Sequence, residues 1–184
     1  GRLATPAGTG TLNNGASAVI AVYAGSGQTD VDATLANAGH IQAQTGTLSL
    51  DGGGSSSGDG IFTAAGAVLR FGTTALGAGG TFAITGGFYA PSNTVVDGGT
   101  LDVSAAGAAV FVDTLRVTAG QLTLGAQNAT DQGSLTQTGG VIAGRGTLTV
   151  INGGFLTGGL QTGPGVTSLQ QISAIGGGVA LDGG

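Results

Sequence analysis

The sequence predicts an all-β fold, a parallel solenoid in which short strands wind into stacked coils. Three observations support this prediction. Glycine accounts for 41 of the 184 residues, short segments that alternate apolar and polar residues recur along the chain, and many of these segments begin about 20 residues apart. A solenoid needs a tight corner after every short strand, and glycine has the conformational freedom that such corners require.

The composition argues against disorder and against long helices. Charged residues make up 7% of the chain and hydrophobic residues 40%, whereas disordered chains combine high charge with few apolar residues. Lys, Glu and Met, which are among the best helix formers, do not occur, while Gly, Thr and Val are abundant. Strands are therefore the expected secondary structure.

A five-residue unit marks the expected strands. It consists of a glycine, a small or polar residue, and then an apolar, a polar and an apolar residue, which is the alternation of a strand with one buried face. Further alternating pieces lie between the units, at 94–97 and 114–118, so each repeat is expected to hold two or three strands. Clear and looser copies of the unit lie, in order, at 46–50, 66–70, 80–84, 99–103, 120–124, 133–137, 146–150 and 178–182.

The spacing favours a solenoid over an antiparallel sandwich or barrel, which also consist of many short strands. With about 20 residues per coil and roughly 4.8 Å between coils, the chain makes about nine coils and a rod of about 43 Å. Each inward Leu or Val then lies above its equivalent in the preceding coil. We expect one solenoid over residues 1–184, with the Gly- and Ser-rich segment 51–60 as an exposed loop at one corner; a flexible linker is the alternative.

The charges exclude two classes of partner. The formal net charge is −5, and the four basic residues are scattered arginines. Without a basic stripe, the chain is not expected to bind nucleic acid or an anionic membrane surface.

The longest apolar stretches, such as 18–24 and 105–112, are far shorter than the roughly 20 residues that span a bilayer. The lack of cysteine excludes a disulfide scaffold and a thiolate metal site.

A serine–histidine site is formally present in the sequence. His40 is the only histidine, and Ser56 is at the centre of a Gly-x-Ser-x-Gly match at 54–58. The nucleophile elbow with these letters needs a strand before the serine and a helix after it, whereas this match lies inside a Gly/Ser run. We therefore expect a loop serine and a surface or loop histidine, and a single histidine cannot chelate a metal ion by itself.

Carboxylates offer a second candidate chemistry. Asp30 and Asp32 are two residues apart and would share a face of a strand, as an acid–base pair does. Asp51 and Asp59 have the hard oxygen ligands that calcium prefers, but the repeated calcium-binding nonapeptide is not present. We expect solvated acids and turn formers here, and hence no catalytic, cofactor-binding or metal-binding residues and no cofactor.

Threonines and tyrosines are candidates for surface recognition. Thr-x-Thr occurs at 9–11, 45–47, 136–138 and 147–149, but its irregular spacing favours ordinary strand surface over an ice-binding array. Tyr23 and Tyr89 are the only tyrosines. They are expected to pack at the edge of the core, and stacking on sugar rings is the alternative.

Segments 98–103 and 135–154 resemble a known family. They are similar to the glycine- and threonine-rich right-handed parallel β-helices of bacterial exported proteins, namely autotransporter passengers and filamentous-haemagglutinin-like adhesins. The resemblance covers most of the chain from about residue 40. It implies a right-handed coil and an extracellular or cell-surface location, and it brings no catalytic residues with it.

These observations favour a non-enzymatic structural role. The expected function is a stiff stalk or fibre of a secreted, adhesin-like surface protein, with the chain as a segment of something larger. The expected partners are further copies of the chain, stacked head to tail or laterally, the rest of a longer surface protein, and host or matrix glycans. The alternatives are a polysaccharide-degrading enzyme, which needs an exposed groove with clustered Asp and Arg, and a glycan- or ice-binding surface on the same scaffold.

Overall fold

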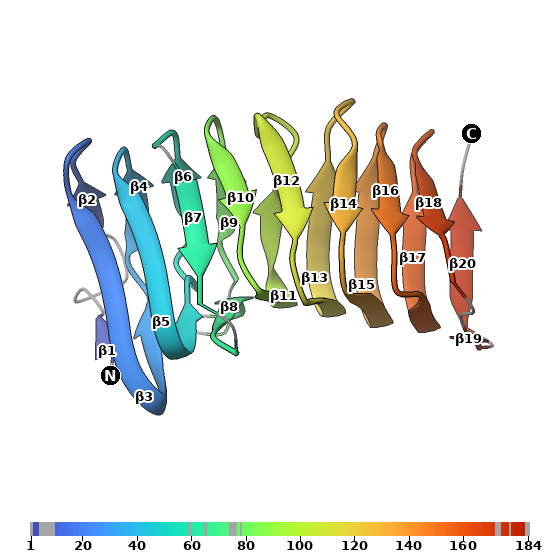
Figure 1. Ribbon diagram of the computed structural model, residues 1–184, viewed down its shortest axis with the longest axis horizontal. Coiled ribbons are helices and arrows are strands. Elements are labelled where there is room, and N and C mark those ends of the chain that lie inside the picture. The colour runs from blue at the N-terminus through green and yellow to red at the C-terminus, as the bar shows by residue number, and fades with distance from the viewer. Residues whose placement is uncertain are drawn as a thin grey trace.

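The chain is an elongated stack of coils in the computed structural model, with the first strands at one end and the last strands at the other (Figure 1). The structure describes residues 2–3, 10–58, 60–64, 66–73, 77, 79–171, 174–176 and 178–182. These residues form strands and turns and contain no helix that could cross a membrane. About eight coils of about 20 residues stack on one another, which confirms the predicted all-β solenoid and is close to the nine coils expected.

All strands belong to one sheet that winds around the rod, and every pairing between described strands is parallel. The strands are β1 (Arg2–Leu3), β2 (Thr11–Asn14), β3 (Val19–Val31), β4 (Thr34–Asn37), β5 (His40–Ser49), β6 (Gly54–Ser56), β7 (Gly60–Thr63), β8 (Val68–Phe71), β9 (Thr81–Ile84), β10 (Phe88–Ala90), β11 (Asn93–Asp102), β12 (Ala108–Phe111), β13 (Thr114–Leu124), β14 (Ala129–Asp131), β15 (Ser134–Gly144), β16 (Thr147–Val150), β17 (Gly154–Thr162), β18 (Val166–Leu169), β19 (Ala174–Ile175) and β20 (Val179–Asp182).

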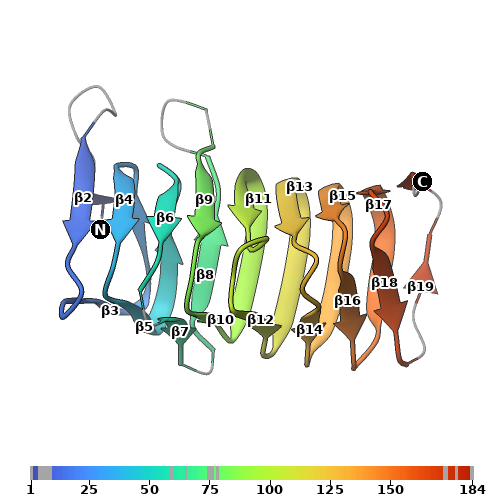
Figure 2. The same ribbon diagram turned by 90° about the horizontal axis from the view of Figure 1, so that it is seen from above.

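Three faces run along the rod, and the longest strands bend from one face to the next (Figure 2). Face 1 consists of β2, β4, β6, β9, the second halves of β11, β13, β15 and β17, and β20. Face 2 consists of the first halves of β3 and β5, then β7, β10, β12, β14, β16 and β18. Face 3 consists of β1, the second halves of β3 and β5, β8, the first halves of β11, β13, β15 and β17, and β19.

The three faces explain the irregular spacing of the sequence repeats. The units at 99–103 and 120–124 lie on the same face of successive coils, because a step of about 20 residues is one full coil. The unit at 133–137 begins only 13 residues after 120, since it advances by two faces within the coil. Each of the predicted units overlaps a strand, and each coil holds three strand segments, one on each face.

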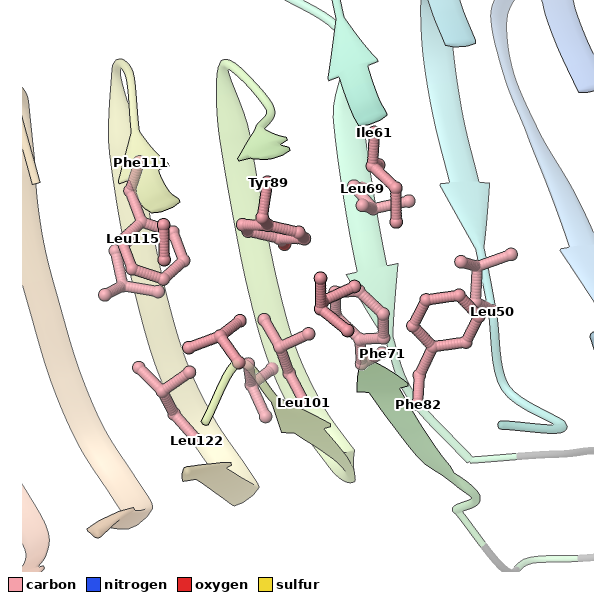
Figure 3. Packing of buried hydrophobic residues seen from close by; sticks show 14 of the residues in the cluster. Leu50, Ile61, Leu69, Phe71, Phe82, Tyr89, Leu101, Phe111, Leu115 and Leu122 are labelled. Atoms are coloured by element: carbon pink, nitrogen blue, oxygen red, sulfur yellow. The ribbon is translucent and has the colours of Figure 1, made fainter. Parts of the chain in front are cut away.

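The core is a narrow column of inward side chains in register from coil to coil. On face 1, for example, Phe82, Leu101 and Leu122 are stacked partners and are fully buried. An aromatic cluster fills the middle coils, where the ring centroids of Phe71 and Phe82 lie 5.8 Å apart and those of Tyr89 and Phe111 lie 5.5 Å apart, edge to face (Figure 3). This column makes the rod one continuous cooperative core rather than separate modules.

Glycine is required where one coil corner lies directly on the next. Gly120 has φ of 72°, and a Cβ built on it would lie 2.0 Å from the carbonyl oxygen of Gly99 in the preceding coil. Both the left-handed backbone and the close approach exclude a side chain at this position. Tight corners that stack directly on one another therefore explain the high glycine content, as the sequence predicted.

Segment 51–60 is not a loop throughout, because it contains β6. Gly54 has φ of 129° and lies against Leu35 of the preceding coil, where a Cβ would be 1.9 Å from the carbonyl oxygen of Leu35. Ser56 is buried and continues a row of polar side chains from the preceding coils. Tertiary stacking thus places a Gly/Ser segment with linker-like composition in the wall of the rod, while Asp59 lies outside the described residues.

Candidate functional site

The structure does not assemble a serine–histidine site. Ser56 is buried in β6, its Oγ accepts a hydrogen bond from Asn37 Nδ2 at 2.7 Å, and its carbonyl oxygen accepts one from Thr85 Oγ1 at 3.1 Å. No helix follows it, so the nucleophile-elbow geometry is missing at this serine. His40 is half-buried at the start of β5, on face 2, whereas Ser56 is on face 1.

Ser56 is the last member of an amide ladder inside the first coils. Asn14 Nδ2 donates to Asn37 Oδ1 at 2.6 Å, and Asn37 Nδ2 donates to Ser56 Oγ and to the carbonyl oxygen of Gly39 at 3.0 Å. All three ladder side chains are buried. Their polar atoms are satisfied by one another across the coils, which makes the ladder a structural element rather than a reactive site.

Asp30 and Asp32 do not form an acid–base pair on one strand face. Asp32 lies beyond the end of β3 and is buried, with its carboxylate 2.6 Å from a guanidinium nitrogen of Arg2. Asp30 lies within β3 and accepts a hydrogen bond from Gln28. The strand ends between the two positions, so the alternation on which the prediction relied does not reach Asp32.

A mixed charge cluster lies on face 3 and its corner with face 1. Arg70 forms an ion pair with Asp97 at 3.0 Å, and Thr118 Oγ1 donates to Asp97 Oδ1 at 2.9 Å. The hydrogen bonds from Arg70 and Thr118 lower the pKa of Asp97. Asp51 is buried beside them, and desolvation raises the pKa of its carboxyl although the Ser49 hydroxyl, at 2.7 Å, and the Gly72 amide, at 2.8 Å, both donate to it.

An enzyme of the kind considered above needs clustered Asp and Arg, and this cluster supplies them, but both carboxylates already have hydrogen-bond partners. Asp97 is held by Arg70 and Thr118, and Asp51 is enclosed by backbone and by Ser49. Such an arrangement stabilises the stacking of neighbouring coils. Among the described residues, no three carboxylate or histidine side chains converge as ligands for one metal ion.

Asp131 is the one buried side chain of the described residues with an unsatisfied polar atom. Asp131 lies on face 2, is 0% exposed and is stacked between Phe111 and Val150. Its Oδ1 accepts a hydrogen bond from the Gly133 amide at 3.0 Å, whereas its Oδ2 has no hydrogen-bond partner. Burial raises the pKa of Asp131 to about 7. This carboxyl is accordingly protonated over much of the acidic range, where it is a neutral member of an apolar stack.

The tyrosines and threonines take different positions from those expected. Tyr89 is 0% exposed in the centre of the core, where its hydroxyl lies 3.0 Å from Thr94 Oγ1, whereas Tyr23 is 72% exposed at the surface. The core-edge prediction is therefore wrong for both. The described Thr-x-Thr pairs lie on different faces, at 45–47 around a corner and at 147–149 on face 2, so they form no common array; Thr9 lies outside the described residues.

The C-terminal end of the rod holds a pocket of about 310 Å³. Its walls come from all three faces of the last coils and combine apolar side chains with the polar side chains of Gln161, Thr162 and Thr167. The apolar lining residues are Leu124, Ile142, Ala143, Leu156, Val166, Leu169 and Ile175. The pocket is thus the open interior of the solenoid where the stack of described coils ends.

The backbone edges around this pocket are open within the described residues. β18 pairs with β16, β19 pairs with β17, and β20 pairs with β17, each on one side only. Val166 is 58% exposed and Ile175 is 69% exposed on these strands. Unpaired edge groups beside an apolar interior are the features that accept another strand. We take this end as the candidate functional site.

Comparisons with family models, curated proteins and solved structures yield no match.

Three features could not be predicted from the sequence, for different reasons: the amide ladder, Asp131 and the C-terminal pocket. Asn14 and Asn37 carry a signal, since both end a four-residue strand in successive coils, but only the register shows that they touch. Asp131 occupies an inward position of the alternation that begins at Ala129. The pocket has no local sequence signal, because it is assembled from three faces.

Proposed function

We propose that this chain is a stiff structural rod, a stalk or fibre segment of a secreted bacterial surface protein of the adhesin-like kind. The observation that carries the proposal is the uninterrupted stack: about eight coils share one column of buried side chains and one set of parallel ladders. At roughly 4.8 Å per coil, the stack is about 38 Å long. Bending it would break ladders on one face and open the packed core, so it holds a fixed distance.

The polar groups support a structural role over a catalytic one. The ladder of Asn14, Asn37 and Ser56 and the pairs of Arg70 with Asp97 and Arg2 with Asp32 connect different coils. These polar groups form hydrogen bonds and ion pairs between coils. The resemblance of segments 98–103 and 135–154 to exported β-helices favours the cell surface or the extracellular medium as the location, and no enzymatic activity is proposed.

Imaging the rod between two markers tests this proposal. A globular marker fused to each terminus should give, in electron micrographs, a single narrow distribution of marker separations. A broad distribution, as for a flexible linker, would contradict the role as a rigid spacer. Turnover of a polyuronate that is lost in an Asp97→Asn variant would support the enzyme alternative, and saturable binding on a glycan array would support the glycan-binding one.

A further inference from the structure

We propose that Asn152 is a self-modification site, at which the backbone nitrogen of Gly153 attacks the Asn152 side chain and converts its amide into a carboxylate. The reaction needs water but no enzyme and no cofactor. The inference goes beyond the structural role proposed above, because it names a residue that changes chemically within the folded rod. It is carried by the surroundings of Asn152 at its corner of the coil.

The dipeptide that undergoes this chemistry occurs twice in the sequence, at 14–15 and at 152–153. Asparagine followed by glycine is the reactive arrangement, because glycine has no Cβ to shield its backbone nitrogen. The structure distinguishes the two copies. Asn152 is exposed at the corner between β16 and β17, whereas Asn14 is buried at the end of β2.

The backbone nitrogen of Gly153 is available as the nucleophile. The carbonyl oxygen of Gly153 accepts from the Leu135 amide at 3.2 Å, and the Asn152 amide donates to Gly133 at 3.0 Å. The Gly153 N–H itself has no acceptor among the residues that the structure describes. No hydrogen bond therefore has to break before this nitrogen loses its proton. Gly153 is buried, but the carbon that it attacks belongs to the exposed residue next to it.

The side-chain carbonyl of Asn152 is polarised for the attack. Gln171 Nε2 donates to Asn152 Oδ1 at 3.2 Å. Negative charge develops on Oδ1 as the nucleophile adds, and a donor directed at this oxygen stabilises the intermediate. The leaving nitrogen, Asn152 Nδ2, donates to the carbonyl oxygen of Gln132 at 2.6 Å. Because Asn152 is exposed, water can supply the proton with which this nitrogen leaves.

Water is the only other reactant that the chemistry requires. The bond between the Gly153 nitrogen and Asn152 Cγ forms, the bond from Cγ to Nδ2 breaks, and ammonia departs with the proton that the Gly153 nitrogen has lost. A succinimide ring remains. Water then opens the ring at Cγ, which gives aspartate, or at the backbone carbonyl carbon, which gives isoaspartate. Either product adds one negative charge to the formal net charge of −5.

The amide ladder protects the second copy of the dipeptide. Asn14 is 6% exposed, and its Nδ2 donates to Asn37 Oδ1 at 2.6 Å and to the carbonyl oxygen of His40 at 3.0 Å. Attack by the Gly15 nitrogen would break these hydrogen bonds and place a carboxylate beside buried acceptors. We therefore expect the folded chain to react at Asn152 and not at Asn14.

The modification also loosens its corner of the rod. A carboxylate at position 152 cannot donate to the Gln132 carbonyl oxygen and repels it instead. Isoaspartate further adds a backbone carbon just before β17, whose residues pair in register with β15. Amide exchange in β16 and β17 should therefore be faster in the modified chain than in the unmodified chain.

Incubation at mildly alkaline pH followed by peptide mapping tests the proposal. Trypsin cleaves after arginine, so the two dipeptides lie in separate peptides, 3–70 and 146–184. Each event replaces an NH₂ group by OH and raises the peptide mass by a single mass unit, and fragmentation locates the residue. In the folded chain, the modified fraction of 146–184 should grow with time while 3–70 keeps its mass. In urea, where the ladder is lost, both peptides should react at comparable rates.

Two variants serve as controls. Asn152→Gln keeps an amide at this position, but its longer side chain closes a larger ring much more slowly, so peptide 146–184 should keep its mass. Gln171→Leu removes the donor to Oδ1 and should slow the reaction several-fold in the folded chain while leaving the rate in urea unchanged.

Three results would overturn the proposal. The first is a folded chain in which 146–184 keeps its mass while the same peptide reacts in urea. The second is a reaction at Asn14 that is as fast as the reaction at Asn152 in the folded chain, which would show that burial and the ladder do not select the site. The third is a mass increase of 146–184 that persists in the Asn152→Gln variant, which would assign the reaction to another residue.

Discussion

Asn37 Nδ2 donates to Ser56 Oγ across 2.7 Å and so joins the side chains of two successive coils inside the rod. Asn37 also accepts from Asn14 at 2.6 Å, and both Asn37 and Ser56 are buried. One amide therefore satisfies polar groups above and below it, in a region from which water is excluded.

We expect Asn37→Ala to destabilise the rod by about 3 kcal/mol, because it removes the three hydrogen bonds that the Asn37 amide makes inside the rod, with Asn14, with Ser56 and with the carbonyl oxygen of Gly39. Urea unfolding followed by circular dichroism measures the change in the free energy of unfolding. Asn152→Ala is the matched control: Asn152 Nδ2 also donates between coils, to the carbonyl of Gln132, but it is exposed, so a loss below about 1 kcal/mol is expected. Equal losses in both variants would contradict a buried ladder.

Asp131 makes stability depend on pH. Its pKa is raised from 3.8 to about 7 in the folded chain, so the folded state binds this proton more tightly than the unfolded state. The proton on Asp131 therefore stabilises the folded chain. Its contribution to the free energy of unfolding, about 4 kcal/mol, is complete below pH 3.8 and is lost as the pH rises through about 7. The phenylalanine and valine stacked against it carry no charge that would offset this loss.

Comparing the free energy of unfolding at pH 4 and pH 8 measures this effect. Asp131→Asn should remove most of the difference between the two pH values, because its amide does not titrate. Asp113→Asn, at an exposed position of the preceding coil, is the matched control and should keep the wild-type dependence. An Asp131→Asn variant with the wild-type pH dependence would show that this carboxyl is not the responsible group.

Glycine substitutions separate backbone strain from coil-to-coil contact. Gly25 and Gly120 both have positive φ, at 61° and 72°, but a Cβ at Gly25 meets nothing within 4 Å, whereas at Gly120 it meets the Gly99 carbonyl oxygen at 2.0 Å. Gly25→Ala should therefore cost only the left-handed conformation, about 1 kcal/mol, and Gly120→Ala several kcal/mol more. Thermal unfolding midpoints rank the two variants, and similar midpoints would argue against the close stacking of corners.

The two tyrosines provide a further pair. Tyr89→Phe removes a buried hydroxyl that lies 3.0 Å from Thr94 Oγ1 and leaves the Thr94 hydroxyl unpaired, so a loss of about 1–2 kcal/mol is expected. Tyr23→Phe changes a side chain that is 72% exposed and should leave the free energy of unfolding unchanged. Denaturant unfolding measures the free energy of unfolding of both variants. A loss of stability in Tyr23→Phe and none in Tyr89→Phe would mean that the inward and outward side chains of these strands are assigned wrongly.

The strands and glycine corners could be predicted from the sequence because their signals are local. The units at 99–103 and 120–124 alternate strictly and begin with glycine, and both are strands in the same register. Tyr23 and Tyr89 could not be assigned, since the runs around them are apolar on both sides of the strand and give no alternation. In segment 51–60, the local composition resembles that of a linker, and only the contacts of Gly54 with Leu35 and of Ser56 with Asn37 place it in the wall.

The open end could not be predicted from any local pattern. The pocket is lined by β18 and β19 together with residues of β13, β15 and β17, so residues from several coils and all three faces form it. Asp131 could not be predicted as a buried residue for a related reason: its inward direction follows from its register with Phe111 and Val150 rather than from its residue type.

The most direct test of a stiff, stacked rod is a pair of spin-label distances along one register row. Asn13, Asp102 and Thr162 belong to the same outward row of face 1. The chain contains no cysteine, so double variants such as Asn13→Cys with Asp102→Cys and Asn13→Cys with Thr162→Cys can be labelled specifically. Four and seven coil steps predict backbone separations of about 19 Å and about 34 Å.

Pulsed electron paramagnetic resonance should give two narrow distributions whose means differ by about 14 Å, that is, by three coil steps. Distributions that are broad, or means that do not increase with the number of coils between the labels, would contradict both the stack and its stiffness.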